Sequence, residues 1–358
     1  MRASPRKLAL VAVGLCVIGF ILYRSRTFFH FGDFSGAKLL HAVRDANLPL
    51  LALSVVAIYA CYALRSLRWQ VFQRNLGPSH FWNIYKLTLA GFSALFLLGR
   101  AGEPIRPLLL ARKEKLPIAD MFGIYVLERI FDIASAAVIA AIGFFLQPAA
   151  KTTGSLLFAG VITAVAALVY LRLHGTFLLE RRLQAVLATQ SWQAKFARIV
   201  LGVARGVQTL RTWGQLVLAV LYSTAHWFLV LLVYLWVSHS FGGALGAIRL
   251  RDAMVVLAFT LFGSAVQAPG VGGGSQAASF IAYTAIFGVE REPAAAAAIV
   301  LWLISFAMCS VVGVPLLIHE GWSLGQLREI AKHEDQMLDQ EMAGSSGDTR
   351  TRQGESAE

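Results

Sequence analysis

The sequence predicts an all-α polytopic membrane protein with about six full transmembrane helices and two opposed re-entrant hairpins, arranged as an inverted repeat. Composition is the first observation, because 57% of the 358 residues are hydrophobic and only 15% are charged. The second is a series of apolar stretches, most of them long enough to cross a hydrocarbon core of about 30 Å. The third is a pair of apolar stretches that glycine and proline interrupt in the middle.

Eight apolar stretches cover most of the chain. They are residues 8–23, 48–64, 82–98, 118–147, 153–171, 215–238, 253–289 and 294–318. No segment of soluble-domain composition is left over, so residues 1–320 are predicted to form one membrane domain with repeat halves of about 7–147 and 153–320. The first stretch follows basic residues, as in a signal peptide. It lacks a small-residue cleavage site, so we expect a retained transmembrane helix.

The distribution of lysine and arginine predicts the orientation of these stretches. Cytoplasmic loops carry an excess of both residue types. The N-terminus, the C-terminal tail and the blocks at 65–74, 112–115 and 172–211 are therefore placed in the cytoplasm. The connections at 24–47, 148–152, 239–252 and 290–293 are poorer in both and are placed on the other side, with Arg24 and Arg26 as a local exception.

Two stretches are predicted to turn back inside the membrane. Residues 65–80 and 112–117 are on the same side, so 82–111 must turn near Gly99–Pro104 and return. By the same reasoning, 253–289 enters from the opposite side and turns near Pro269–Gly274. Lipid cannot satisfy the backbone groups of a broken helix, so such breaks survive only inside protein or beside water. A matched pair of interrupted segments is typical of transport sites. Hydropathy alone leaves open two closely spaced crossings in place of each hairpin.

Two segments outside the predicted helices have their own character. Residues 172–211 hold seven basic residues and one acid, interleaved with apolar residues at helical spacing. That pattern predicts an amphipathic segment on the anionic cytoplasmic leaflet, and this placement of the net charge of +12 argues against nucleic acid as a partner. Residues 321–358 are predicted to be a polar cytoplasmic tail, largely disordered.

Ionisable residues gather at the first hairpin and in the next apolar stretch. Arg100, Glu103 and Arg106 surround the turn, while Glu128 and Asp132 lie four residues apart on one helix face. Arg129 lies on the same helix, three residues before Asp132, at a spacing that allows the two to pair. Charges inside a membrane are costly, so the group is either a polar pocket where arginines hold a lipid phosphate or a closed ion-pair network that pins the hairpin. Both interpretations remain open on the sequence.

The second hairpin carries glycines in place of charges. Gly270, Gly272, Gly273 and Gly274 allow tight turns, and Gln276 adds a polar side chain. Consecutive free backbone amides form anion-binding concavities, although glycine serves equally well for close helix packing.

The remaining polar residues are predicted to be structural. The three cysteines, Cys16, Cys61 and Cys309, lie in apolar stretches without metal-ligand spacing and are expected to be buried. His226 is expected to satisfy a neighbouring helix. Membrane-interface anchors are predicted on both sides of the 75–80 connection; they are Arg65, Arg68, Trp69, Arg74, Trp82 and Tyr85. No nucleophile or metal motif is present, and no cofactor is predicted.

Three motifs carry a resemblance to a known family. They are Gly99-Arg-Ala-Gly-Glu-Pro-Ile-Arg106, Glu128-Arg129-x-x-Asp132 and Pro269-Gly-Val-Gly272. The chain resembles the flippase-like membrane domain of lysylphosphatidylglycerol synthases (the multiple peptide resistance factor) and the related stand-alone uncharacterised integral membrane proteins, over residues 8–320. The resemblance implies movement of an aminoacylated or glycosylated lipid between leaflets. Members usually carry glutamate where this chain has Gln276. Only a short polar tail follows residue 320, so the soluble aminoacyl-transferase domain is expected to be absent.

The sequence therefore predicts translocation of an anionic, aminoacylated or glycosylated phospholipid or polyprenyl-phosphate lipid across a bacterial-type inner membrane, with both termini cytoplasmic. The alternative is an intramembrane transferase or an accessory subunit in lipid or glycolipid synthesis, and a further rival is a scaffold whose basic segment recruits a partner. Membrane lipids, and a lipid-synthesising enzyme, are the expected partners. The candidate substrate-binding residues are Arg100, Gly102, Glu103, Arg106, Glu128, Arg129, Asp132, Pro269, Gly270, Gly272, Gly273 and Gln276.

Overall fold

A computed structural model describes residue 41, residues 43–174, residue 210, and residues 212–319 apart from 269 and 271. The predicted helix at 8–23, most of the basic segment at 172–211, the tail at 321–358, Cys16 and Pro269 lie outside the described residues.

Helices make up nearly all of the described chain. The first half contains α3 (Leu48–Gln73), α4 (Phe81–Leu98), the 3-10 turn η1 (Gly99–Gly102), α5 (Ile105–Glu114) and α6 (Ile118–Phe145), and the 3-10 turn η2 (Pro148–Ala150) connects the halves. The second half contains α7 (Lys151–His174), α10 (Trp213–Ser240), α11 (Gly243–Gly246), α12 (Leu250–Gly263), the short strands β1 (Gln267–Ala268) and β2 (Gly272–Gly273), α13 (Gly274–Ile281), the π-helical η3 (Ala282–Ile286), α14 (Arg291–Trp302), the π-helical η4 (Leu303–Ala307) and α15 (Met308–His319).

Local sequence explains where α3 and α10 begin. Asn47 caps α3, because its side chain accepts a hydrogen bond from the Leu50 amide at 3.3 Å. Thr212 and Gln215 form a capping box at the start of α10, in which each side chain binds the other's backbone amide. Both helices therefore start at fixed residues, which fixes the register of the side chains that follow.

The first interrupted segment is an antiparallel helical hairpin. α4 ends at Gly99, whose φ of +66° favours glycine, and η1 leads into α5. Asn83, near the start of α4, donates to the Glu114 carboxylate at the end of α5 at 3.1 Å. The chain thus leaves and returns at the same end of the bundle.

The second interrupted segment also turns back. β1 and β2 pair as a small antiparallel turn, with Gln267 opposite Gly273, and α13 packs against α12. The two turns meet, because the Gly270 amide donates to the Phe96 carbonyl of α4 at 2.8 Å. The Phe96 ring in turn lies 5.7 Å from the Trp302 ring of α14. The tips of both hairpins are therefore in direct contact.

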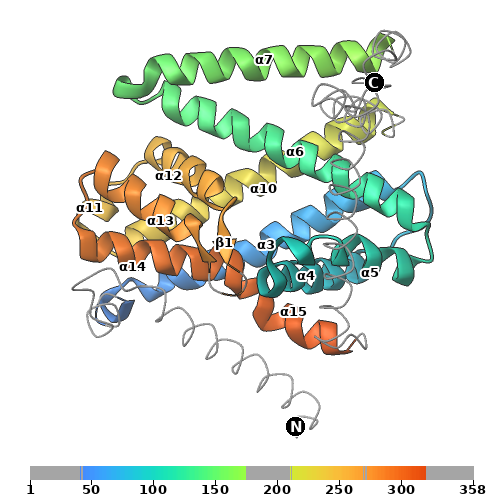
Figure 1. Cartoon of the computed structure of the whole chain (residues 1–358), viewed down its shortest axis with the longest axis horizontal. Coiled ribbons are helices and arrows are strands. Elements are labelled where there is room, and N and C mark those ends of the chain that lie inside the picture. Colours follow the sequence, from blue (N-terminus) through green and yellow to red (C-terminus); the bar gives the residue numbers. More distant parts are fainter. Residues whose placement is uncertain are drawn as a thin grey trace, which may run out of the picture.

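The two halves pack with opposite sense. α3 and α10 lie side by side and antiparallel (Figure 1). At one end the backbone amide of Asn47 donates to the Ser240 carbonyl at 2.7 Å, and at the other the side chain of Asn75 donates to that of Gln215 at 3.2 Å. α4 packs on α15, the last helix of the other half, and α12 likewise packs on α6. Each hairpin is thus held by the closing helix of the opposite half.

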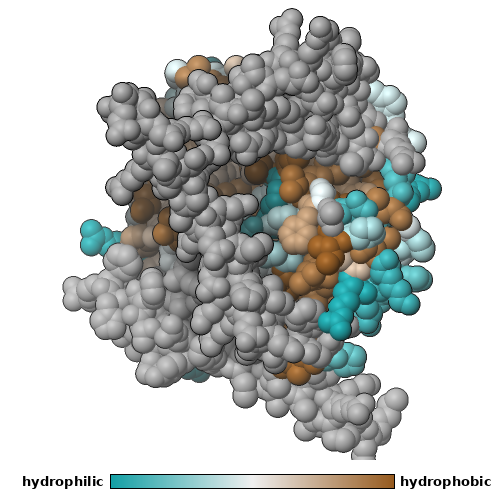
Figure 2. All heavy atoms as spheres, turned by 45° about the vertical axis from the view of Figure 1, so that its right-hand side comes forward, coloured by the Kyte–Doolittle hydropathy of each residue, from teal (hydrophilic) through white to brown (hydrophobic). Residues whose placement is uncertain are grey.

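The protein is a helical multi-pass membrane protein. Four helices in the described part are long and apolar enough to cross a membrane, namely α3, α4, α10 and the continuous Arg291–His319. The pair Asp120–Phe145 and Pro148–Ala164, bent by 114°, makes a fifth if it counts as one span. These four or five stand against the six crossings predicted, of which 8–23 lies outside the described residues. Among the described residues that Figure 2 shows, hydrophobic side chains form a continuous patch right of centre, as lipid contact requires, and hydrophilic ones lie along its right-hand edge.

One predicted boundary is wrong. The second apolar stretch does not end at residue 64, because α3 continues for another two turns to Gln73. Arg65, Arg68 and Trp69 are therefore inside the bundle, with exposed fractions of 8%, 1% and 0%, and they do not anchor the helix at the membrane surface. Trp82, by contrast, is 65% exposed in the first turn of α4.

Candidate functional site

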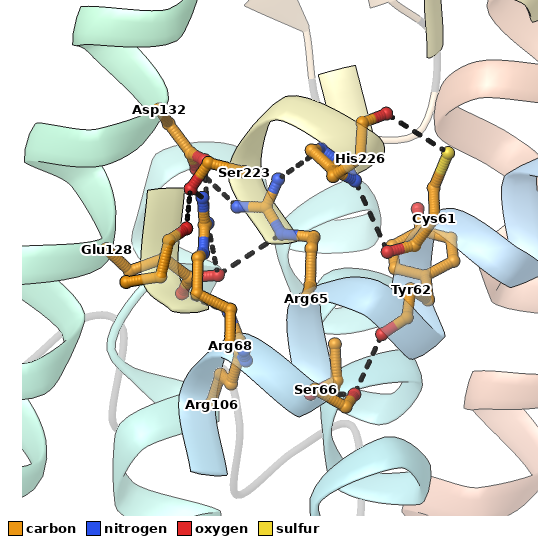
Figure 3. Close-up of polar contacts among 12 residues, drawn as sticks. Cys61, Tyr62, Arg65, Ser66, Arg68, Arg106, Glu128, Asp132, Ser223 and His226 are labelled. Carbon is orange, nitrogen blue, oxygen red and sulfur yellow. Dashed lines mark hydrogen bonds and ion pairs between the residues drawn. The ribbon is translucent and has the colours of Figure 1, made fainter. Parts of the chain in front are cut away.

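Five charged side chains from α3, α5 and α6 form a buried cluster. Arg65 and Arg68 come from α3, Arg106 from α5, and Glu128 and Asp132 from α6, and all five are buried (Figure 3). Helical periodicity places the two α3 arginines, and likewise the two α6 carboxylates, on one face of their helix. We call these five residues the arginine cluster.

The two carboxylates share the three arginines. Glu128 accepts from Arg106 Nη1 at 2.5 Å and from Arg68 Nη2 at 3.1 Å, and its Oε1 lies 3.2 Å from Arg65 Nε. Asp132 accepts from Arg68 Nη2 at 2.7 Å through Oδ1 and from Arg65 Nη2 through Oδ2. Every charge in the cluster thus has an opposite charge in contact, as buried ions require.

The arginine cluster nevertheless carries a net positive charge. Three arginines and two carboxylates leave one positive charge unmatched (3 − 2 = 1). Three buried N–H donors of the cluster, Arg106 Nε, Arg106 Nη2 and Arg68 Nε, have no hydrogen-bond acceptor within the described part of the chain. An unsatisfied buried donor costs about 1–3 kcal/mol, more for a charged group. The cluster is therefore short of both negative charge and acceptor oxygens.

Aromatic rings wall the arginine cluster. The Arg106 guanidinium lies 4.4 Å from the centre of the Trp69 ring and 5.3 Å from that of Phe92. Arg65 lies 4.8 Å from the centre of the same Phe92 ring. The faces of aromatic rings attract cations, and a guanidinium is weakly hydrated, so these rings stabilise buried arginine without neutralising it.

His226 and Ser223 of α10 close the cluster on its fourth side. Arg65 Nη1 lies 3.3 Å from His226 Nε2, and His226 Nδ1 lies 3.3 Å from the Cys61 carbonyl oxygen (Figure 3). The carbonyl accepts and the guanidinium donates, so the imidazole is neutral with its proton on Nδ1. Arg68 Nη1 donates to Ser223 at 2.9 Å. The expected contact of His226 with a neighbouring helix is thus present.

Glu103 and Arg129 form a smaller group beside the cluster. The Tyr125 hydroxyl donates to Glu103, and the Arg129 guanidinium lies 4.9 Å from the centre of the Tyr125 ring. Tyr125 thus ties the turn of the first hairpin to α6. The ion pairs of Asp132 among the described residues are with Arg65 and Arg68, and Arg129 acts on this carboxylate only through its nearby charge. The Arg100 side chain lies outside the described part.

Close packing explains the glycines of the first hairpin. A β-carbon on Gly102 would lie 2.4 Å from the Ala94 carbonyl oxygen, and one on Gly91 would lie 2.4 Å from Arg106 Cβ. The η1 turn and the start of α5 therefore approach α4 as closely as backbones allow. This contact delivers Arg106 to the arginine cluster.

The backbone amides in the glycine run of the second hairpin are bonded within the protein, whereas an anion-binding concavity would require free amides. The Gly273 amide donates to Gln276 Oε1 at 2.6 Å, the Gly274 amide to the Val266 carbonyl at 2.9 Å, and the Gly270 amide to Phe96. These three amides already have partners, so they do not form an open anion-binding concavity. Gly272 has a φ of +83°, and a β-carbon there would meet the Gln276 amide. Gly270, Gly272, Gly273 and Gln276 shape this turn, which meets the first hairpin at Phe96.

Arg65 and Arg68 are site residues that the sequence analysis did not identify, because it interpreted them as interface anchors. A signal was available, because the apolar side chains of Trp69, Val71 and Phe72 continue beyond the two arginines. A helix that resumes its apolar character after a charge buries that charge rather than ending there.

Three comparisons with known proteins bear on this site. A family model described as "Lysylphosphatidylglycerol synthase TM region" matches residues 8–313. Comparison with curated proteins and comparison with solved structures each return no match. Among the described residues, no group of three or more His, Cys, Asp or Glu side chains is arranged to hold a metal ion, and Cys61 and Cys309 are buried free thiols.

Proposed function

The chain belongs to the lysylphosphatidylglycerol synthase transmembrane-region family, and from this premise we propose that it moves a phosphate-bearing lipid between the leaflets of the membrane. The lipid class is an anionic, aminoacylated or glycosylated phospholipid, or a polyprenyl-phosphate lipid. The head group binds at the arginine cluster.

The single observation that carries this proposal is the deficit of negative charge and acceptors in the arginine cluster. A phosphate group supplies both, since its oxygens accept several N–H bonds and match the fork of a guanidinium bidentately. Arg106 Nε and Nη2 are the two adjacent donors left without an acceptor among the described residues. They are our proposed contact for the phosphate, with Arg100 as a second expected cation.

The arrangement of the two halves supports an alternating-access mechanism. Two equivalent helices that pack antiparallel are related by an axis across them, which is the relation expected of an inverted repeat. The hairpins meet tip to tip at Gly270 and Phe96, and each packs on the closing helix of the other half. In our proposal both hairpins are re-entrant, and rocking of the halves exposes the cluster to each side in turn.

The remaining assignments follow from charge and chemistry. We place the protein in a bacterial-type inner membrane with both termini cytoplasmic, because the lysine-rich and arginine-rich connections face inward. Membrane lipids are its proposed partners, together with an enzyme that makes the transported lipid. We propose no catalytic step: Glu128 and Asp132 each contact at least two arginines, which leaves neither carboxylate suited to act as a base.

Gene deletion with leaflet-resolved lipid analysis tests the function. We expect one phosphate-bearing lipid to keep its total amount and to change its distribution between the leaflets. A lipid that disappears altogether would contradict translocation and support a transferase or accessory role in lipid synthesis.

Substitution of Arg106 tests the site. Arg106→Gln removes the unmatched charge and the paired donors, and we expect at least about a tenfold loss of lipid movement, since a charged hydrogen bond contributes about 1.5–3 kcal/mol. Arg112→Gln is the matched control, because Arg112 is exposed on the same helix. Both variants are assayed for flipping of labelled lipids in proteoliposomes, after the folded fraction has been measured. Equal activity of the two variants would exclude the cluster as the head-group site.

A further inference from the structure

One titratable side chain in contact with the arginine cluster has no role in the proposed function so far. His226 is 5% exposed and lies in the middle of α10. Its Nε2 atom accepts from Arg65, which at the same time binds Asp132. The histidine therefore touches one of the two arginines, Arg65 and Arg68, that contact both carboxylates of the cluster.

We infer that His226 is the proton-binding site of this translocator, and that a proton on its Nε2 atom is coupled to anion binding in the arginine cluster through Arg65. The inference rests on the proposed function, because it assigns the coupling ion for the same site.

The hydrogen-bond geometry requires a choice between Arg65 and a proton. The Cys61 carbonyl keeps Nδ1 protonated, so an added proton from water goes to Nε2. Once Nε2 carries a proton it donates, and it can no longer accept from the Arg65 guanidinium. Arg65 must then turn away from the imidazolium. No electron transfer or bond cleavage is involved.

The charges around His226 determine what this movement does. Arg65 and Arg68 face it from α3 and Asp132 faces it from α6, while its own helix adds the neutral Ser223 and Trp227. An imidazolium takes the place of Arg65 beside Asp132. Arg65 is then released toward an incoming anion, and the net charge of the cluster rises from one to two. Proton binding therefore strengthens anion binding, and by reciprocity a bound anion favours the proton.

The test uses the full-length chain in phosphatidylcholine nanodiscs, with short-chain phosphatidylglycerol as the probe. Its phosphodiester keeps one charge across the range used, so the probe itself does not titrate. Calorimetry in two buffers of different ionisation enthalpy gives both the affinity and the protons taken up, from about pH 5.5 to about pH 8, a range on both sides of the ordinary pKa of a solvent-exposed histidine. We expect up to about a tenfold gain in affinity per pH unit of acidification, with about one proton taken up per lipid.

Two variants of the same helix make the comparison sharp. His226→Gln places a neutral amide that accepts from Arg65 and stays neutral, so we expect its affinity to be independent of pH. His239→Gln is the control, since His239 lies in the last turn of α10, where it bonds to the Ile248 carbonyl. It should keep the wild-type pH dependence. If binding by the wild-type chain takes up no proton, or if His226→Gln keeps the pH dependence, the inference is overturned while the proposed function stands.

A second measurement needs no substitution at position 226. Nitrogen-15 spectra of the wild-type chain labelled at histidine should show one buried histidine in the Nδ1–H form. Adding the lipid at constant pH should convert that signal to the doubly protonated form. If no histidine signal responds although calorimetry detects binding, His226 is not the coupling site. If the probe does not bind at any pH, the proposed function and this inference both fail.

Discussion

Individual residues of the arginine cluster depend strongly on one another. Glu128 contacts all three arginines, so its carboxylate is the central counter-charge of the group. Taking charges out of water costs several kcal/mol per ion, and the attraction between partners offsets this cost only while every partner is present. The stability of the protein is therefore expected to be sensitive to the loss of this carboxylate.

Neutralising Glu128 should destabilise the fold. Glu128→Gln leaves three buried arginines with one carboxylate, so we expect a loss of about 3–5 kcal/mol in the free energy of unfolding. Asp45→Asn, which breaks the exposed pair with His41, is the control and should have little effect. Denaturant unfolding in detergent measures both. Adding Arg106→Gln to Glu128→Gln should restore part of the lost free energy of unfolding. If Glu128→Gln and the control Asp45→Asn destabilise the protein equally, this account is contradicted.

At the scale of elements, the first hairpin depends on small residues. Its two helices approach at Gly91 until a β-carbon would overlap Arg106, and η1 contacts α4 at Gly102. In lipid, the hydrophobic effect does not drive helices together, and close van der Waals packing does so instead. Small residues at the contact allow the backbones to approach closely enough for this packing. The position of Arg106 in the cluster is therefore a consequence of backbone packing in the hairpin.

A methyl group at Gly91 should loosen the hairpin. We expect Gly91→Ala to lower the free energy of unfolding by about 1–3 kcal/mol, as overpacking of a close contact does, and to reduce lipid movement with it. The matched control is Gly123→Ala in α6, where nothing lies within 4 Å of the added carbon. Thermal unfolding and the flipping assay are compared for both. A normal Gly91→Ala variant would show that α4 and α5 do not pack this closely.

At the scale of the whole molecule, the connections gather at two ends. The α3–α4 connection, the end of α5 and the start of α10 are at one end, where Asn75 bonds to Gln215 and Asn83 to Glu114. The other end joins the start of α3 to the end of α10, and the Gln147 amide there donates to Asp252 at 2.6 Å. Figure 1 shows these ends at its right and left sides. The hairpins therefore begin at opposite ends.

Thiol labelling should reveal this sidedness. In a chain whose three cysteines are replaced by alanine, His80→Cys and Lys113→Cys flank the first hairpin and Ala247→Cys lies at the other end. We expect an impermeant maleimide to label Ala247→Cys in intact spheroplasts, and to label the other two only after permeabilisation. Labelling of His80→Cys and Lys113→Cys from opposite sides would show that the segment crosses the membrane, and that it is not re-entrant.

Local signals in the sequence were strong enough to predict the helical membrane class, the family, the turn at Gly99–Gly102 and the involvement of Arg106, Glu128 and Asp132. Apolar length, the cost of charge in lipid and the backbone freedom of glycine act within one segment, so they can be read without knowledge of its neighbours. The same reasoning failed for Arg65 and Arg68, which lie near the predicted end of a helix and resemble interface anchors.

The amino-acid sequence alone identifies this chain as a multi-pass membrane protein whose apolar segments carry charges and are interrupted twice. The packing of the helices was needed to show that α3 runs on to Gln73, that its two arginines meet the carboxylates of α6, and that His226 accepts from Arg65. These contacts join residues on three helices that are at least 60 positions apart in the chain. Their partners are selected by how the helices pack and in which direction each runs, and no local pattern of side chains encodes that choice.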